Sequence, residues 1–162
     1  METLMSDVQK ILNFFDGIGL SYQLTELSEK SFLPGIEIQA GGLNIDLEKL
    51  KYPGDLLHEA GHIAVTAAHD RPKLSGDMKD LGHTGAEETA AIAWSYAACK
   101  HLNFAPELVF HPQGYRGAAD NLISAFETGG GFGFPLLSYW DMCEPIGQPN
   151  GYPIMKTWLR SE

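Results

Sequence analysis

The pattern of apolar and polar positions changes its period along the chain, and it predicts one helix followed by several short strands. Four apolar residues recur at helical spacing and predict an amphipathic helix over about residues 6–15. They are Val8, Ile11, Leu12 and Phe15. Residues 21–27, 36–39 and 43–46 instead alternate polar and apolar side chains, as half-buried strands do. The small residues 40–42 suit a hairpin turn between the last two strands.

Three further helices are expected in the rest of the chain. Asp55 is a good N-cap for a helix that runs to about His69. A capping-box pattern at residues 84–87 opens an Ala-rich helix that runs to about His101. Residues 118–128 form the third, and three glycines follow as its C-cap and a loop. Together these elements predict an α+β fold.

The length and charge of the chain limit its organisation and its partners. With 162 residues and no internal repeat or linker, we expect a single domain over residues 1–162. The chain carries 21 acidic against 11 basic residues, a formal net charge of −10. Because no Lys/Arg cluster is present, this surface is a poor partner for phosphate backbones and anionic membranes. We therefore expect neither a nucleic-acid partner nor a membrane partner.

The N-terminal sequence and the cysteines favour a cytoplasmic location. The first residues lack the basic and apolar regions of a signal peptide, and no stretch reaches the ~18 apolar residues of a membrane helix. Cys99 and Cys143 lie far apart without CxxC spacing. Without a secretion signal, they are expected to be reduced thiols, not a disulfide or a metal pair.

Residues 58–62 read His-Glu-Ala-Gly-His, an H-E-x-x-H motif inside a predicted helix. Side chains at i and i+4 lie on one helix face with Cβ atoms about 6 Å apart, so His58 and His62 can bind one Zn²⁺ at ~2.0–2.1 Å. Glu59 lies ~100° round the helix, where it misses the metal but reaches a metal-bound water. Zinc lowers the pKa of such a water toward ~7, and the carboxylate can take its proton. Alternatively, the two histidines are ordinary packing residues.

A catalytic zinc needs a third protein ligand and one open position. His69 would lie ~10 Å further along a straight helix, too far to share the ion. The next helix offers Glu87 and Glu88. If Thr84 is the N-cap, Glu87 turns back to the cap amide, which leaves Glu88 as the expected third ligand. Glu87 stays open as the alternative ligand, and so does the reading that both acids only favour the helix N-terminus electrostatically.

Residues 58–62 resemble the zincin metalloprotease signature, and Glu88 on a following helix resembles the gluzincin branch. The resemblance covers about 31 residues and implies a small zincin-like α+β fold, in which a mixed or antiparallel sheet packs against the active-site helix and further helices. It also implies that His58, His62 and a downstream Glu bind zinc and that Glu59 is the general base. An edge strand before the helix would hold an extended substrate, and residues 43–46 are the matching strand.

The pentapeptide is also similar to the peptidase domain of membrane-bound AAA proteases, in which the third ligand is an Asp. Asp77 and Asp80 are weaker ligand candidates in this chain. Residues 110–117 form a loop with a compact cluster of hydrogen-bond donors: His111, Tyr115 and Arg116. Because amide hydrolysis builds negative charge on an oxygen, we expect Tyr115 or His111 to stabilise it. The alternative is a loop whose polar side chains simply meet water.

The leading hypothesis is therefore a zinc-dependent hydrolase, a metallopeptidase that acts on a peptide or small amide substrate. His58, His62 and Glu88 would hold the zinc, and Glu59 would act as base and then as acid. A second hypothesis is a zincin-fold binding or regulatory protein that retains zinc without turnover. A third is a structural zinc site closed by a fourth ligand, against which Glu59 argues because a closed site needs no acid there.

Overall fold

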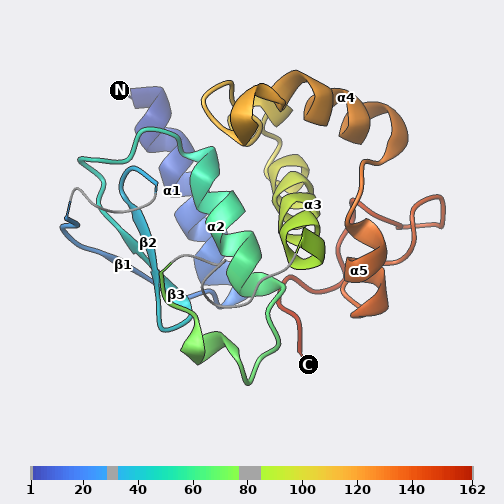
Figure 1. The fold of residues 1–162 in the computed structure, drawn as a ribbon, viewed down its shortest axis with the longest axis horizontal. Helices are drawn as coiled ribbons and strands as arrows, with labels where there is room; N and C mark the ends of the chain where they lie inside the picture. The colour runs from blue at the N-terminus through green and yellow to red at the C-terminus, as the bar shows by residue number, and fades with distance from the viewer. Residues whose placement is uncertain (1, 29–32, 77–84, 162) are drawn as a thin grey trace.

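The computed structural model describes residues 2–28, 33–76 and 85–161 (Figure 1). Within these residues the chain is an α+β protein, as predicted, with five α-helices and a three-stranded mixed sheet. In chain order the elements are α1 (Glu2–Ile18), β1 (Tyr22–Leu24), β2 (Ile36–Gln39), β3 (Gly42–Ile45), α2 (Gly54–Ala64), the 3-10 turn η1 (Arg71–Lys73), α3 (Gly85–His101), the 3-10 turns η3 (Pro106–Leu108) and η4 (Tyr115–Gly117), α4 (Ala119–Gly129) and α5 (Phe134–Tyr139).

The strands form a sheet in the order β1-β3-β2. β2 and β3 form the expected antiparallel hairpin, with Ile36 opposite Ile45 and Ile38 opposite Leu43. Buried residues alternate along both strands, which gives the sheet one apolar face. The expectation that residues 43–46 form an edge strand is wrong, because β1 pairs in parallel with the other side of β3. The central strand has both sides paired and cannot add an extended substrate by backbone hydrogen bonds.

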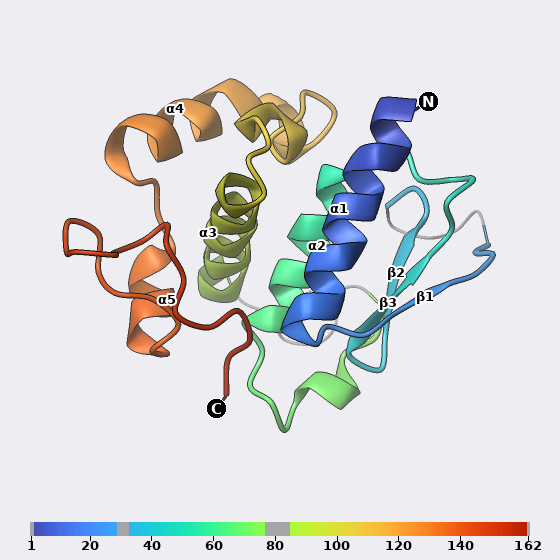
Figure 2. The same cartoon turned by 180° about the vertical axis from the view of Figure 1, so that it is seen from behind.

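α2 lies between the sheet and α3, with α4 and α5 beyond α3 (Figure 1). Seen from behind, α1 runs across α2 beside the sheet (Figure 2). The apolar face predicted for α1 is buried, and Ile11 and Phe15 share one core with Leu56 and Leu57 of α2. This core therefore packs against the apolar side of α2, and the polar face of the helix points away from it.

α2 and α3 approach each other closely because small residues meet at their crossing. A Cβ atom at Gly61 would lie only 2.7 Å from the backbone oxygen of Ala91. α3 presents a run of buried alanines to this contact, at positions 90, 91, 93, 97 and 98. The short side chains bring the start of α3 next to the middle of α2, where the H-E-x-x-H motif lies.

Both predicted ends of α2 are wrong, although its centre is where the sequence placed it. Pro53, not Asp55, occupies the N-cap position, and Asp55 lies inside the first turn. The helix ends at Ala64 instead of near His69. Arg160 closes this end, because its backbone N–H donates to the Ala64 oxygen at 2.9 Å and its guanidinium Nη1 donates to the Val65 oxygen at 3.1 Å.

Residues 132–161, for which the sequence pattern predicts no element, contain α5 and a segment that packs back on the helices. Trp158 meets Phe14 of α1 edge-on, with ring centroids 4.9 Å apart, and its carbonyl oxygen accepts a hydrogen bond from Trp94 of α3. Cys99 and Cys143 are free and buried, and burial raises the pKa of the Cys99 thiol to about 12. None of the described helices is long and apolar enough to cross a bilayer.

Candidate metal centre

His58 and His62 lie one turn apart on the face of α2 that turns toward the start of α3. Their Nε2 atoms are 3.3 Å apart, and their rings are nearly perpendicular at 84°. Their side chains are 15% and 4% exposed, so both imidazoles are largely removed from water. The i, i+4 spacing thus brings two metal-binding nitrogens together in a mostly buried place.

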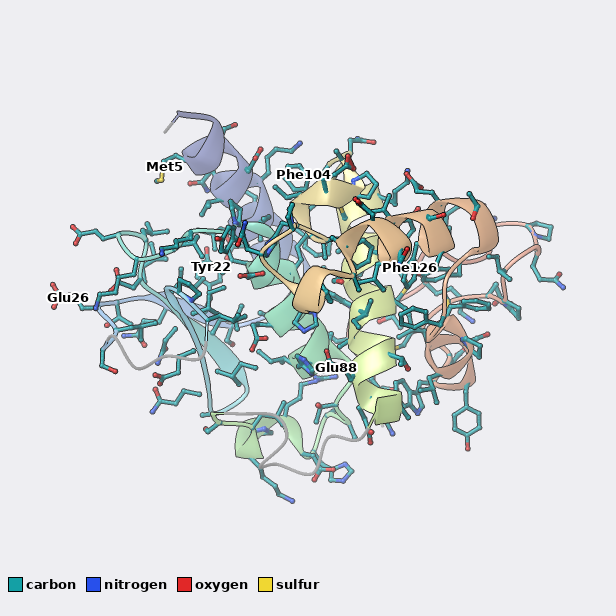
Figure 3. The ribbon with its side chains drawn as sticks, turned by 45° about the horizontal axis from the view of Figure 1, so that its top comes forward. Met5, Tyr22, Glu26, Glu88, Phe104 and Phe126 are labelled. Carbon is teal, nitrogen blue, oxygen red and sulfur yellow. The ribbon has the colours of Figure 1, made fainter. Side chains whose placement is uncertain are left out.

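Glu88, in the first turn of α3, completes a three-residue cluster with these histidines. Its Oε1 lies 3.3 Å from Nε2 of His58, and its Oε2 lies 3.1 Å from Nε2 of His62. One ligand atom from each residue lies within 4.8 Å of the others. Figure 3 labels Glu88 where the first turn of α3 faces α2. The side chain is 45% exposed, so the cluster opens toward solvent on this side.

The alternative ligand, Glu87, does not belong to this cluster within the described residues. Thr84, the expected N-cap of α3, and the weaker candidates Asp77 and Asp80 lie outside the described residues. His69 lies beyond the end of α2, is 77% exposed and contacts Asp70. The structure therefore brings together the three residues that the sequence favoured as ligands and places His69 elsewhere.

The spacing of the two nitrogens fits a zinc site. Their Nε2 atoms are 3.3 Å apart, close to the about 3.3–3.4 Å between two ligand atoms of a tetrahedron at zinc–nitrogen distances of ~2.0–2.1 Å. Each nitrogen meets a different oxygen of Glu88, at 3.3 Å from His58 and at 3.1 Å from His62. Two nitrogens and a carboxylate are also a donor set that zinc accepts, with a fourth position open in catalytic sites. The residues present therefore fit this ion.

The charges within the cluster favour an ionised carboxylate. Partial burial disfavours the charge of Glu88, but hydrogen bonds and attraction from His58 and His62 outweigh it and hold the pKa of Glu88 well below its usual value. Burial likewise opposes a charge on His58, yet its hydrogen bond to Glu88 and nearby acids raise its pKa. Imidazole nitrogens and a carboxylate oxygen are among the ligands that zinc accepts.

Glu59 follows His58 on α2 and is partly exposed. Desolvation raises the pKa of its carboxyl, and attraction to His58 and His62 only partly offsets this. Glu59 does not belong to the metal-ligating cluster within the described residues. It therefore offers a carboxyl group near the cluster whose pKa is shifted toward neutral, as suits an acid–base catalyst.

Tyr115 reaches the cluster from the loop after η3. Its hydroxyl oxygen lies 3.0 Å from Nδ1 of His58, on the side of the ring opposite Nε2. The Tyr115 backbone has φ +56°, in the left-handed region that bulky residues avoid. Such conformations cost about 1–3 kcal/mol and persist where the surrounding structure fixes them, often at functional sites. The expected role of Tyr115 in stabilising an oxyanion stays a prediction.

His111, the other expected oxyanion donor, forms a buried pair with Asp55. Its Nε2 lies 2.8 Å from Oδ1 of Asp55, and its ring stacks on Tyr52 with centroids 4.2 Å apart. The sequence pattern does not reveal this pair, since it predicts Asp55 as the helix cap. Pro53 is the residue that indicates the true start of α2, because proline is typical of the first positions of a helix. It places the start of the helix before Asp55.

The glycines after α4 border the cluster through the backbone of α3. Gly130 has φ +78° and forms the C-cap of α4, as predicted. A Cβ atom at Gly133 would lie 2.1 Å from the Thr89 oxygen, so this loop touches α3 one residue after Glu88. The side chain of Arg116 lies outside the described part of the chain.

No protein-family model matches the chain, and neither a curated protein nor a solved structure matches it significantly. The chemistry of the site therefore has to follow from its own residues and their geometry.

Proposed function

We propose that the protein is a zinc-dependent hydrolase, a metallopeptidase that cleaves peptide or other amide bonds. The observation that supports this most is the convergence of His58, His62 and Glu88 in one cluster next to Glu59. The H-E-x-x-H motif resembles the zincin signature, and a glutamate from the next helix is the gluzincin arrangement. We propose the same family assignment for this chain.

His58, His62 and Glu88 would hold the zinc. Zinc bound there would supply Lewis acidity, which lowers the pKa of a water molecule and polarises the carbonyl group of an amide. Glu59 accepts the proton that the attacking water loses and delivers it to the leaving nitrogen. Desolvation raises the pKa of this carboxyl, which strengthens it as a proton acceptor. The partly exposed side of Glu88 leaves the cluster accessible to a substrate from solvent.

The metal content of the purified protein tests the first half of this proposal. Mass spectrometry of protein prepared without added metal should find near-stoichiometric zinc in the wild type and little in His58→Ala. His69→Ala is the matched control, because His69 is exposed and lies outside the cluster. Little zinc in the wild type, even after zinc is added back, would contradict the metal site.

A peptide-library assay tests the second half. Cleavage should fall by about 10²–10⁴-fold in Glu59→Gln, as expected for loss of a general acid–base group, while zinc content is kept. Glu107→Gln removes one negative charge at an exposed position outside the cluster and should cleave like the wild type. Zinc with no cleavage of any library member would favour the alternative, a zinc-retaining binding or regulatory protein.

A further inference from the structure

Both ring nitrogens of His58 have a defined neighbour. Nε2 faces Glu88 and His62, at 3.3 Å from each. Nδ1 faces the hydroxyl oxygen of Tyr115 at 3.0 Å. A metal-binding imidazole must keep a free electron pair on the nitrogen that binds, so its other nitrogen carries the hydrogen. The partner of Nδ1 therefore decides which nitrogen is available.

The direction of this hydrogen bond follows from the proposed zinc site. A tyrosine hydroxyl can donate one hydrogen and can accept through its oxygen. If Tyr115 donated to Nδ1, the one hydrogen of the neutral His58 ring would lie on Nε2 and block metal binding there. Zinc binding through Nε2 therefore requires the Tyr115 oxygen to accept the hydrogen on Nδ1.

Through its hydroxyl oxygen, Tyr115 thus accepts the hydrogen on Nδ1 of His58. We propose that Tyr115 is a positioning residue, which holds His58 with Nδ1 protonated and with the electron pair of Nε2 directed at Glu88 and His62. This inference rests on the proposed function, because it gives a role in zinc binding to a residue that does not itself contact the ion.

The setting of Tyr115 matches a positioning role. Its ring stands edge-on to the His58 ring at 87° and packs against Phe110 at 5.4 Å between centroids. The same loop is tied to α2 a second time, through His111 and Asp55. The left-handed backbone at Tyr115 is thus held between contacts on both sides and aims the hydroxyl at one nitrogen.

The two roles considered for Tyr115 have different consequences. A hydroxyl group that accepts from Nδ1 of His58 acts on zinc affinity. A hydroxyl group that donates its hydrogen to an oxyanion acts on turnover by the zinc-loaded protein.

Zinc affinity, measured by competition with a chelator, tests the inference. Tyr115→Phe keeps the ring and removes only the hydroxyl, and it should lower the affinity by about 10–100-fold. Tyr152→Phe is the matched control, because its buried hydroxyl also bonds to α3, at the Ala93 oxygen, but lies outside the cluster. Its zinc affinity should equal that of the wild type.

An NMR measurement distinguishes a change in the orientation of the His58 ring from a general loosening of the fold. In Co²⁺-substituted protein, the N–H proton of each histidine ligand gives a shifted, solvent-exchangeable NMR signal. The signal of His58 should broaden or disappear in Tyr115→Phe and persist in Tyr152→Phe, at equal thermal stability of the metal-free proteins. If Tyr115→Phe fails to fold, 3-fluorotyrosine at position 115 keeps the hydroxyl group but weakens its oxygen as an acceptor, and it should lower zinc affinity in the same direction; an unchanged affinity would overturn the positioning role.

The outcomes distinguish this inference from the proposed function. A wild type that binds no zinc would overturn both. Zinc in the wild type together with unchanged affinity and an unchanged Co²⁺ spectrum in Tyr115→Phe would overturn the positioning role alone. Full zinc affinity with lost turnover in Tyr115→Phe would also overturn it and would assign the hydroxyl to the oxyanion instead.

Discussion

Two buried carboxylates lie on either side of the connection between β3 and α2, and their environments affect them in opposite ways. Asp46 is 5% exposed and Asp55 is 7% exposed. Hydrogen bonds from backbone N–H groups, chiefly that of Leu27 at 2.9 Å, lower the pKa of Asp46 despite desolvation. Desolvation raises the pKa of Asp55, because His111 only partly offsets it. Burial alone therefore does not determine the pKa of a carboxyl group, because the hydrogen-bond donors around the carboxylate can outweigh it.

The largest expected effect comes from removing Asp55. Asp55→Ala leaves His111 in a buried position without its partner, which should cost about 3–5 kcal/mol of unfolding free energy. Urea denaturation of the metal-free protein measures this loss. Asp55→Asn keeps an oxygen that can accept from Nε2 of His111 and should lose clearly less. Equal losses in the two variants would show that the hydrogen bond to His111 is not what matters.

Removing Asp46 should destabilise the protein less than removing Asp55. In Asp46→Ala the backbone N–H groups of Leu27 and Glu48 lose their carboxylate acceptor. The Glu48 bond is only partly buried, so water can replace the carboxylate there in part, and the main cost is the buried N–H of Leu27, about 1–3 kcal/mol. The same urea experiment gives the comparison. A greater loss for Asp46→Ala than for Asp55→Ala would reverse the ranking of the two sites.

The pH dependence of stability should separate the two acids by sign. The lowered pKa of Asp46 gives stability that is fully present above the unfolded value of ~3.9 and is lost as pH falls through its folded pKa. The raised pKa of Asp55 does the opposite, because its penalty is absent below ~3.9 and grows as pH rises to its folded pKa.

Acid titrations of stability for Asp46→Asn and Asp55→Asn test this, each relative to the wild type. The first variant should lose part of the acid sensitivity of the wild type, and the second should gain stability relative to the wild type as pH rises from about 4. Changes of the same sign in both variants would contradict the opposite pKa shifts.

The smallest effect is expected at Lys49, whose amino group lies 3.7 Å from Asp46 and whose side chain is 38% exposed. Lys49→Met should cost at most about 1 kcal/mol, because exposed ion pairs contribute little. The difference from the wild type should shrink in high salt. A salt-independent loss would show that packing of the lysine stem, not its charge, stabilises this region.

Local sequence patterns predicted the centre of α2 and failed at its ends, for a physical reason. The spacing of His58 and His62 depends only on the helix period, which neighbouring residues determine. The start of α2 involves Asp55 and His111, and its end is closed by Arg160, so both depend on partners far away in the sequence. The parallel pairing that makes β3 the central strand is also a contact between distant residues.

The residues of the site also divide into those that local patterns predict and contacts that depend on distant parts of the chain. Glu88 was chosen by capping rules within α3, but its approach to the histidines depends on how closely α2 and α3 pack at Gly61. The contact between Tyr115 and His58 joins residues 57 positions apart, and no periodic pattern carries that information. Sequence reasoning identified Tyr115 as a donor near the site without revealing which atom it meets.

The closure of α2 by Arg160 also sets an order of events during protein synthesis. Arg160 is 95 positions beyond Val65, so α2 leaves the ribosome long before the segment that covers its last carbonyl groups. At about 5–20 residues per second, the interval is on the order of 5–20 s. His58, His62 and Glu88 are all available early in that interval. The nascent chain therefore holds all three residues of the proposed metal site while one end of α2 is still open to water.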